Sequence, residues 1–263
     1  MKMFKSPGDI AFQLGFFDIH WYGIIMSFSM LVALIMILFV KRKFFKEITT
    51  DSVFDLSFEV ILCGLIFARL YYVLLDLDYF SQKPLEIIQI WNGGISIQGA
   101  IVGGILAGYL YCKENGYNFF RYADLFVFGG MTGQIIGRWG NFFNSEAFGY
   151  PTELPWKLYI PYKLRPEEFK DFEFFHPTFL YESILNFFAL IVLFYILKKL
   201  GDDRKNGIIF CSYLICYSVI RIIVETFRTD SVLNLSIFHV AHIMAFALII
   251  FAIILLKKIL KTS

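Results

Sequence analysis

The chain has 263 residues, of which 58% are hydrophobic and only 17% are charged. In soluble domains roughly a quarter of all residues are charged, so this composition argues against a soluble globular protein. The net charge of +2 is too balanced to indicate a nucleic-acid partner.

Long apolar blocks recur along the sequence, each close to the roughly 20 residues that a helix needs to cross the hydrocarbon core. The first block lacks a basic segment directly before it and a small-residue cleavage site after it, so we interpret it as an uncleaved span. We predict an all-α polytopic membrane protein with seven transmembrane helices, over residues 19–40, 54–75, 95–112, 123–143, 177–197, 206–225 and 239–256.

Lysine and arginine are distributed unevenly between the two sets of connections. Thirteen of them lie in one alternate set, formed by 41–50, 113–122, 198–205 and the tail. The other set carries eight, and four of these lie in the single long connection 144–176. Because cytoplasmic connections are enriched in Lys and Arg, the asymmetry predicts an outside N-terminus and a cytoplasmic C-terminus.

The long connection 144–176 holds four prolines and many aromatic residues among mixed charges. Trp156, Tyr159 and Tyr162 need other side chains to cover them, so we predict a small folded head on the outer face, within a single membrane domain over 1–263. The four cysteines lie in or at the ends of apolar blocks without a CxxC spacing, and we interpret them as reduced packing residues.

Three arginines, Arg69, Arg138 and Arg221, fall inside or at the ends of apolar blocks. An intramembrane arginine costs at least about 2.5 kcal/mol on insertion scales, so a functional role is the default interpretation. A structural ion pair is the alternative for Arg221, because Glu225 lies four residues on and on the same helix face. Arg138 instead lies in a run of Gly, Asn and Glu residues whose composition is typical of a polar cavity.

A cationic pocket near the membrane surface suits a phospholipid phosphate, because arginine binds phosphate oxygens bidentately and stays charged. The same positive field would stabilise a phosphate leaving group and lower the pKa of an incoming thiol from about 8.5. The small-xxx-small glycines, Gly99 with Gly103 and Gly129 with Gly133 and Gly137, favour close helix packing. The residues alone therefore predict a membrane site for an anionic lipid, with catalysis left open.

The segment from Gly137 to Gly149 resembles the signature of the prolipoprotein diacylglyceryl transferase family. That signature runs Gly-Arg-x-Gly-Asn-Phe-x-Asn-x-Glu-x-x-Gly, and all eight fixed positions match. Further segments resemble the family in the right order between about residues 19 and 228: His20–Gly23, Gly64–Tyr72, Trp91–Gly94, Asp124, His176–Thr178, Leu180–Glu182, Arg221–Glu225 and Phe227–Arg228.

The resemblance implies an enzyme of the bacterial cytoplasmic (inner) membrane that transfers the diacylglyceryl group of phosphatidylglycerol to the lipobox cysteine of a prolipoprotein signal peptide. A thioether forms, glycerol phosphate leaves, and neither a metal nor another cofactor is needed. The implied partners are these two substrates and the lipid bilayer. The alternative function, a transporter or binding protein for an anionic lipid or solute, would predict paired broken helices in two similar halves, which we do not find in the sequence.

The resemblance also implies roles for individual residues. Phosphate and head-group binding falls to Arg138 and Arg221, with Glu182 and Glu225 orienting them as part of the catalytic set. The remaining substrate-binding residues implied are Asn141, Asn144, Glu146, Gly149, Tyr22, His20 and Arg69.

One position departs from the family in a way that bears on the chemistry. Many members carry a histidine, cast as a general base, where this chain has Gln98. Glutamine forms hydrogen bonds but accepts no proton in the working pH range. Either another residue, with His239 as the candidate alternative base, takes this role, or no strong base is needed because a thiol beside arginines is already partly ionised. We favour the second; His176, before Pro177, is interpreted as a helix-start residue.

Overall fold

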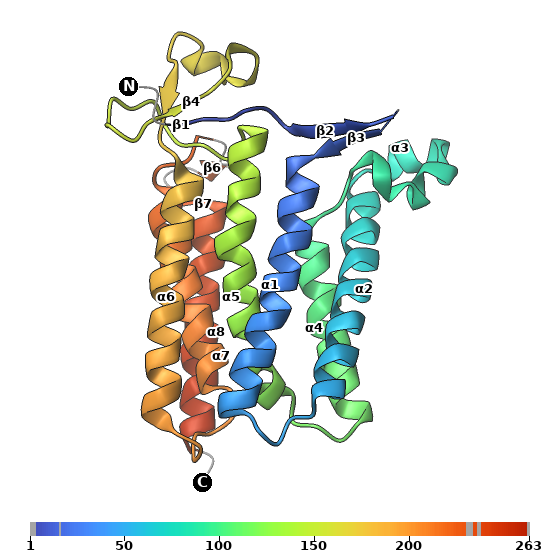
Figure 1. Ribbon diagram of the computed structural model, residues 1–263, viewed down its shortest axis with the longest axis vertical. Helices are drawn as coiled ribbons and strands as arrows, with labels where there is room; N and C mark the ends of the chain where they lie inside the picture. Colours follow the sequence, from blue (N-terminus) through green and yellow to red (C-terminus); the bar gives the residue numbers. More distant parts are fainter. Residues whose placement is uncertain (1–3, 16, 230–233, 236–237, 262–263) are drawn as a thin grey trace. The chain divides into compact units, whose positions relative to one another are not determined.

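The computed structural model describes residues 4–15, 17–229, 234–235 and 238–261, and within them the chain is mainly helical (Figure 1). A long helix occupies each of the seven blocks that the sequence marks as apolar. These helices are α1 (Trp21–Phe44), α2 (Thr50–Leu75), α4 (Ile97–Glu114), α5 (Phe119–Asn144), α6 (Thr178–Leu200), α7 (Ile208–Glu225) and α8 (Val240–Lys261).

Five helices in the described part of the chain are long and apolar enough to cross a membrane: α1, α2, α6, α7 and α8. The other two long helices, α4 and α5, coincide with the predicted third and fourth spans. Their hydropathy is lower because α4 contains several glycines and ends in Lys113 and Glu114, and α5 contains Asp124 and Arg138. The chain is therefore a multi-pass helical membrane protein with five candidate spans among the described residues.

The short elements lie before the first long helix or between long helices. They are β1 (Phe4–Lys5), β2 (Ile10–Leu14), β3 (Phe17–His20), α3 (Leu77–Gln82), β4 (Leu158–Tyr159), β5 (Phe174–Phe175), β6 (Asn234–Leu235) and β7 (Phe238–His239), with 3-10 turns at Pro84–Ile88, Ile90–Asn92, Tyr162–Leu164 and Glu167–Phe169. β2 and β3 form an antiparallel hairpin directly before α1, and β6 pairs antiparallel with β7.

The chain divides into two compact units, one formed by Met1–Phe39 with Ala123–Ser263 and the other by Val40–Tyr122. In the second unit α2 and α4 pack closely at Gly99 and Gly103. A Cβ atom added to Gly103 would lie 2.6 Å from both the Cys63 carbonyl oxygen and the Phe67 Cβ. Glycines at these positions bring the two helices together, as predicted.

In the first unit, polar contacts tie α5 to α6 and α7. Ser183 Oγ of α6 donates to the carbonyl oxygen of Ile135 at 2.8 Å. At the start of α7, the fully buried carboxylate of Asp124 accepts the backbone N–H groups of Gly207 and Phe210, each at 2.7 Å. These bonds satisfy backbone donors at a helix N-terminus, which explains an acidic residue inside the bundle.

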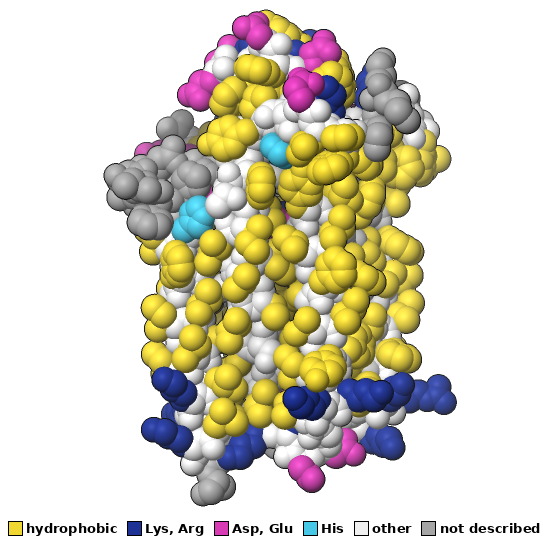
Figure 2. Space-filling view, turned by 90° about the vertical axis from the view of Figure 1, so that its left-hand side faces the viewer, with side chains coloured by type: hydrophobic (Ala, Val, Ile, Leu, Met, Phe, Trp, Pro, Cys, Tyr) yellow, Lys and Arg dark blue, Asp and Glu magenta, His cyan; other side chains and the backbone are white. Residues whose placement is uncertain are grey.

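Figure 2 shows lysine and arginine side chains gathered at one end of the α6–α8 face, below a broad apolar surface. Lys205 Nζ donates to the carbonyl oxygen of Leu260 at 3.0 Å, so the α6–α7 connection lies beside the end of α8. The basic residues of these two segments are Lys198, Lys199, Arg204, Lys205, Lys257, Lys258 and Lys261. They share one side of this unit, as the charge pattern predicted.

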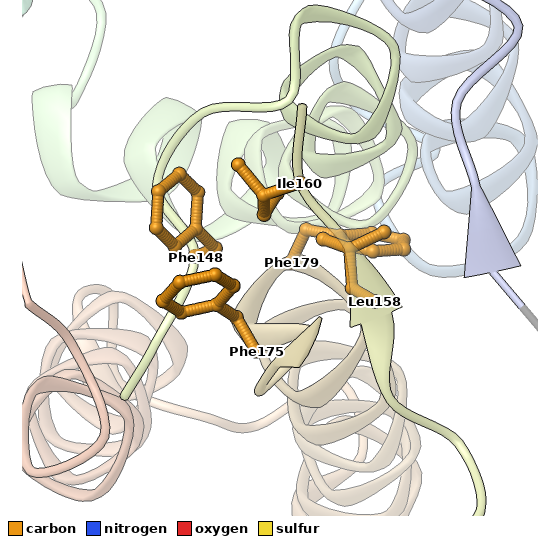
Figure 3. Packing of buried hydrophobic residues seen from close by; sticks show 5 residues of the cluster. All are labelled: Phe148, Leu158, Ile160, Phe175 and Phe179. Atoms are coloured by element: carbon orange, nitrogen blue, oxygen red, sulfur yellow. The ribbon is translucent and has the colours of Figure 1, made fainter. Parts of the chain in front are cut away.

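The long connection between α5 and α6 carries its own apolar cluster (Figure 3). The buried side chains of Phe148, Leu158, Ile160 and Phe175 meet Phe179 from the first turn of α6. β4 lies between β1, which runs parallel to it, and β5, which runs antiparallel. This segment is thus anchored on the N-terminal end of α6.

Candidate functional site

Arg138, near the end of α5, forms an ion pair with Glu182 of α6. The distance between Arg138 Nη2 and Glu182 Oε1 is 2.5 Å, and Glu182 is 2% exposed whereas a quarter of the Arg138 side chain remains exposed. Arg138 Nη1 also lies 3.5 Å from Asn141 Oδ1. The buried carboxylate therefore binds Nη2 of the guanidinium and leaves other N–H groups for a ligand.

The polar residues after Arg138 fold back on each other. Glu146 Oε1 accepts bonds from Asn141 Nδ2 at 2.8 Å and from Asn144 Nδ2 at 3.4 Å. The residues on either side of Glu146 have left-handed backbones, with φ of 52° at Ser145 and 54° at Ala147. Such angles are uncommon outside glycine and cluster at functional sites, because surrounding structure must hold them. Three predicted substrate-binding residues are thus brought together in one tight turn.

Gly149 ties the end of this turn to the ends of α6 and α7. Its N–H donates to the carbonyl oxygen of His176 at 2.9 Å, and it forms an antiparallel bridge with Arg228. The next residue, Tyr150, donates to the carbonyl oxygen of Phe227 at 2.8 Å. A Cβ atom at Gly149 would lie only 2.8 Å from the His176 Cβ, so the close approach of three chain segments requires glycine here.

Arg221 pairs within its own helix. Its Nη2 lies 2.7 Å from Glu225 Oε2, the (i, i+4) partner that the sequence indicated. Glu225 is 2% exposed, whereas the Arg221 side chain keeps a fifth of its surface. The two arginines therefore have the same arrangement, in which a buried carboxylate fixes a guanidinium that is partly open.

Tyr22 and His20 flank the start of α1. The Tyr22 ring packs on α5 at Gly140, where an added Cβ would lie 2.8 Å from the ring carbon Cδ2. Tyr22 is thus placed against the helix that carries Arg138. His20 is half exposed at the end of β3, and its Nδ1 lies 3.4 Å from Asp9 Oδ2.

A polar chain beside the site was not predicted from the sequence. Trp156 Nε1 donates to Tyr181 Oη at 2.9 Å, and Tyr181 Oη lies 3.0 Å from His176 Nδ1. Burial lowers the pKa of the His176 imidazole, so the neutral ring is favoured. Thr178 adds a bond from Oγ1 to the carbonyl oxygen of Ala147. The His-Pro-Thr and Leu-Tyr-Glu segments in the sequence were the available signal for these contacts.

Two predicted site residues, Gln98 and Arg69, belong to the second unit. Gln98 lies exposed in the first turn of α4, and its Oε1 accepts a bond from Ser96 Oγ at 2.6 Å. Arg69 is 8% exposed on α2 and donates to main-chain carbonyl oxygens. These contacts favour a role for Arg69 other than the direct substrate contact that was predicted.

His239, the candidate alternative base, has its backbone in β7, and its side chain lies outside the described residues. Its role stays a prediction. For the remaining predicted residues, the arrangement in the first unit offers two restrained guanidinium groups, a turn of amides and a carboxylate, and a tyrosine ring. Each of these polar groups can contribute to binding a phosphate ester, and the guanidinium groups can stabilise negative charge on its leaving oxygen.

Comparison with known proteins bears on what this site does. A family model described as prolipoprotein diacylglyceryl transferase matches residues 9–257. Curated relatives named phosphatidylglycerol–prolipoprotein diacylglyceryl transferase include one from Trichormus variabilis, 43% identical over 234 residues, which cover 88% of this chain and 82% of the relative. The relative of that name from Synechocystis is 40% identical over 250 residues, covering 94% and 87% of the two chains. The one from Gloeobacter violaceus is 42% identical over 233 residues, covering 88% and 85%.

Proposed function

This chain belongs to the prolipoprotein diacylglyceryl transferase family, and on that premise we propose that it transfers the diacylglyceryl group of phosphatidylglycerol to the lipobox cysteine of bacterial prolipoproteins. The observation that carries the proposal is the signature from Gly137 to Gly149, whose arginine is held by a buried carboxylate and stays open to a ligand. The family resemblance and the geometry therefore support the same activity.

The reaction is a displacement at carbon. The cysteine sulfur attacks the glycerol carbon that bears the phosphate, a C–S bond forms, and the C–O bond to the phosphate breaks. Glycerol phosphate leaves with the electron pair of that bond, and the thiol proton is lost to solvent. The negative charge that develops on the departing phosphate oxygen is where a positive group stabilises the transition state most.

We assign phosphate and head-group binding to Arg138 and Arg221. Each uses Nη2 in its carboxylate pair, so other N–H donors of each fork are available to phosphate oxygens. Glu182 and Glu225 act as positioning residues that fix the orientation of the two forks. Asn141, Asn144, Glu146 and Gly149 shape the pocket wall, and Tyr22 and His20 line its entrance.

The acceptor thiol needs to be ionised, since the thiolate is the nucleophile. Two guanidinium groups close to the incoming cysteine favour the thiolate by their charge alone, without a side chain that takes the proton. Gln98 then serves as a hydrogen-bonding group in the catalytic set. His239 remains the alternative base.

We also propose the finer membrane arrangement. α4 and α5 cross the bilayer together with the five candidate spans, giving seven spans with the N-terminus outside and the basic ends of α6 and α8 in the cytoplasm. The connection 144–176 then forms an extracytoplasmic head. The protein lies in the bacterial cytoplasmic (inner) membrane, where a signal peptide presents its lipobox cysteine to the outer leaflet.

The test uses the full-length protein in vesicles that contain labelled phosphatidylglycerol, incubated with a peptide carrying a lipobox cysteine. We expect a thioether-linked product in which a label in the diacylglyceryl group has been transferred to the peptide. Arg138→Lys should reduce the rate by about 100-fold, because lysine cannot bind phosphate bidentately. Arg42→Lys, the same change at an exposed position at the end of α1, should not alter the rate. Lipid binding or transport by the folded wild type without product would overturn the transferase assignment.

A further inference from the structure

The guanidinium of Arg69 is almost fully occupied by the main chain of its own unit. Nε donates to the carbonyl oxygen of Ile87 at 2.8 Å, and Nη1 donates to those of Gly93 at 2.8 Å and Gly94 at 2.7 Å. Nη2 donates to the carbonyl oxygen of Glu86. Four of the five N–H donors of the fork are therefore used. Phosphate could bind bidentately only if these bonds broke.

The surroundings of Arg69 fit a planar guanidinium group better than a compact ammonium group. Its Cζ lies 5.0 Å from the ring centroid of Phe80 and 5.8 Å from that of Tyr72, which places aromatic rings around the charge. A Cβ atom on Gly94 would lie 2.6 Å from Arg69 Nη1, so the chain approaches the fork as closely as a glycine permits. A lysine ammonium cannot reach four carbonyl oxygens arranged around a fork.

Two of the carbonyl groups that Arg69 binds, those of Gly93 and Gly94, belong to the turn directly before α4. Gly93 and Gly94 both have positive φ, 86° and 75°, and form the turn before that helix. Ser96 N donates to the carbonyl oxygen of Ala68 at 3.0 Å, next to Arg69 on α2. Ser96 Oγ in turn donates to Oε1 of Gln98. α2 therefore holds the turn on both sides, and a short chain of contacts connects Arg69 with the Gln98 side chain.

We propose that Arg69 is a positioning residue, which fixes the Gly93–Gly94 turn and with it the first turn of α4 that carries Gln98, and that it does not bind the phosphate itself. The inference rests on the proposed transferase function and on the catalytic role of Gln98. It separates the three intramembrane arginines into two that bind a ligand and one that holds the backbone.

Kinetics with Arg69→Lys test the positioning role. We expect kcat to fall about tenfold or more while the KM for phosphatidylglycerol changes less than about twofold, because no phosphate contact is lost. Inhibition by glycerol phosphate should keep its wild-type constant in Arg69→Lys, whereas Arg138→Lys should weaken it. A raised KM or weakened inhibition in Arg69→Lys would make Arg69 a phosphate ligand and overturn the proposal.

A double substitution tests whether Arg69 acts through Gln98. Gln98→Ala should lower kcat, and adding Arg69→Lys to it should change kcat less than about twofold further, because residues that act as one unit are not additive. If the fold-losses in kcat of the two single variants multiply in the double variant, Arg69 acts independently of Gln98. An unchanged kcat in Gln98→Ala would show that Gln98 has no catalytic role for Arg69 to support. Either result contradicts the proposal.

Hydrogen–deuterium exchange of the protein in lipid nanodiscs measures, independently of catalysis, how firmly Arg69 holds the Gly93–Gly94 turn. We expect amides of 86–98 to exchange faster in Arg69→Lys and those of α5–α7 to stay as in the wild type. The matched control is Arg121→Lys in the same unit, whose Nε and Nη2 each lie 2.5 Å from Glu47 Oε1. It should alter neither kcat nor exchange at 86–98. If the wild type forms no thioether, the proposed function fails. Unchanged exchange at 86–98 in Arg69→Lys would separately overturn the proposal that Arg69 holds the turn.

Discussion

Glu182 Oε1 lies 2.5 Å from Arg138 Nη2, and the carboxylate is buried while the guanidinium is partly exposed. The pair joins α6 to α5 and leaves the positive partner facing the site. A buried acid in this position costs desolvation energy that its ion pair must offset. Its charge thus fixes where the arginine points, and the pair is the basis for the first prediction.

Glu182→Gln should lower the transferase rate by about 10- to 100-fold, because the amide keeps a hydrogen bond but removes the charge that holds the Arg138 fork. Initial rates with phosphatidylglycerol and a lipobox peptide measure this effect. Glu153→Gln is the control, since that carboxylate pairs with Lys157 at an exposed position. A Glu182→Gln rate within twofold of the wild type would contradict the positioning role.

Gly149→Ala should destabilise the protein, because the added methyl group meets the Phe227 carbonyl oxygen and the His176 Cβ. Overpacking of this kind costs about 1–3 kcal/mol, which should appear as a lower Tm in detergent micelles. Gly130→Ala is the matched control, since among the described residues an added Cβ there meets no atom within 4 Å outside the adjacent backbone of its own helix. An equal Tm for Gly149→Ala and the wild type would show that the three segments can move apart to accept the methyl group without a loss of stability, and would contradict the prediction.

His176 should make stability depend on pH in the mildly acidic range. Its pKa is lowered by burial in the folded protein, so below the ordinary histidine value near 6.5 the unfolded chain binds more protons than the folded one. This contribution is fully favourable above that value, and it is lost as the pH falls toward the folded-state pKa. His176→Asn keeps an acceptor for Tyr181 but does not titrate.

The Tm of His176→Asn should therefore fall less between pH 7 and pH 5 than that of the wild type. The His20→Asn variant provides the comparison, because it removes a histidine whose side chain is half exposed. If both variants follow the wild-type curve, the buried imidazole does not control stability in this range.

Activation of the thiol by arginine charge predicts that His239 is dispensable. His239→Gln should retain the wild-type rate within about twofold over the pH range of activity, measured with the same peptide assay. Arg221→Gln should lose activity in parallel experiments, since it removes one of the two positive charges. Loss of activity in His239→Gln with normal folding would instead establish an imidazole base.

The sequence predicted the positions of the long helices well, because the length of apolar blocks with few charges reflects the thickness of the bilayer. It also predicted the Arg221–Glu225 pair, which depends only on helical spacing. The partner of Arg138 could not be found in this way. Glu182 lies far along the chain, and only resemblance to a family brought it into the site.

The role of Arg69 shows a different limit. Composition marks an intramembrane arginine as functional but cannot say whether its donors meet a ligand or a carbonyl oxygen. Here the deciding partners are backbone atoms of a turn, which carry no side-chain signal in the sequence. The chain of Trp156, Tyr181 and His176 escaped prediction for a similar reason, because it depends on how the 144–176 segment folds onto α6.

The bonds from Gly149 and Tyr150 to the segment after α7 also constrain biosynthesis. The signature turn leaves the ribosome long before Phe227 and Arg228, so it must wait through the synthesis and insertion of two further helices for these partners. Contacts of high sequence separation form late because loop closure must precede them. A nascent chain released before residue 227 would carry the complete signature and still lack these contacts, so a truncated product would have an unfinished site.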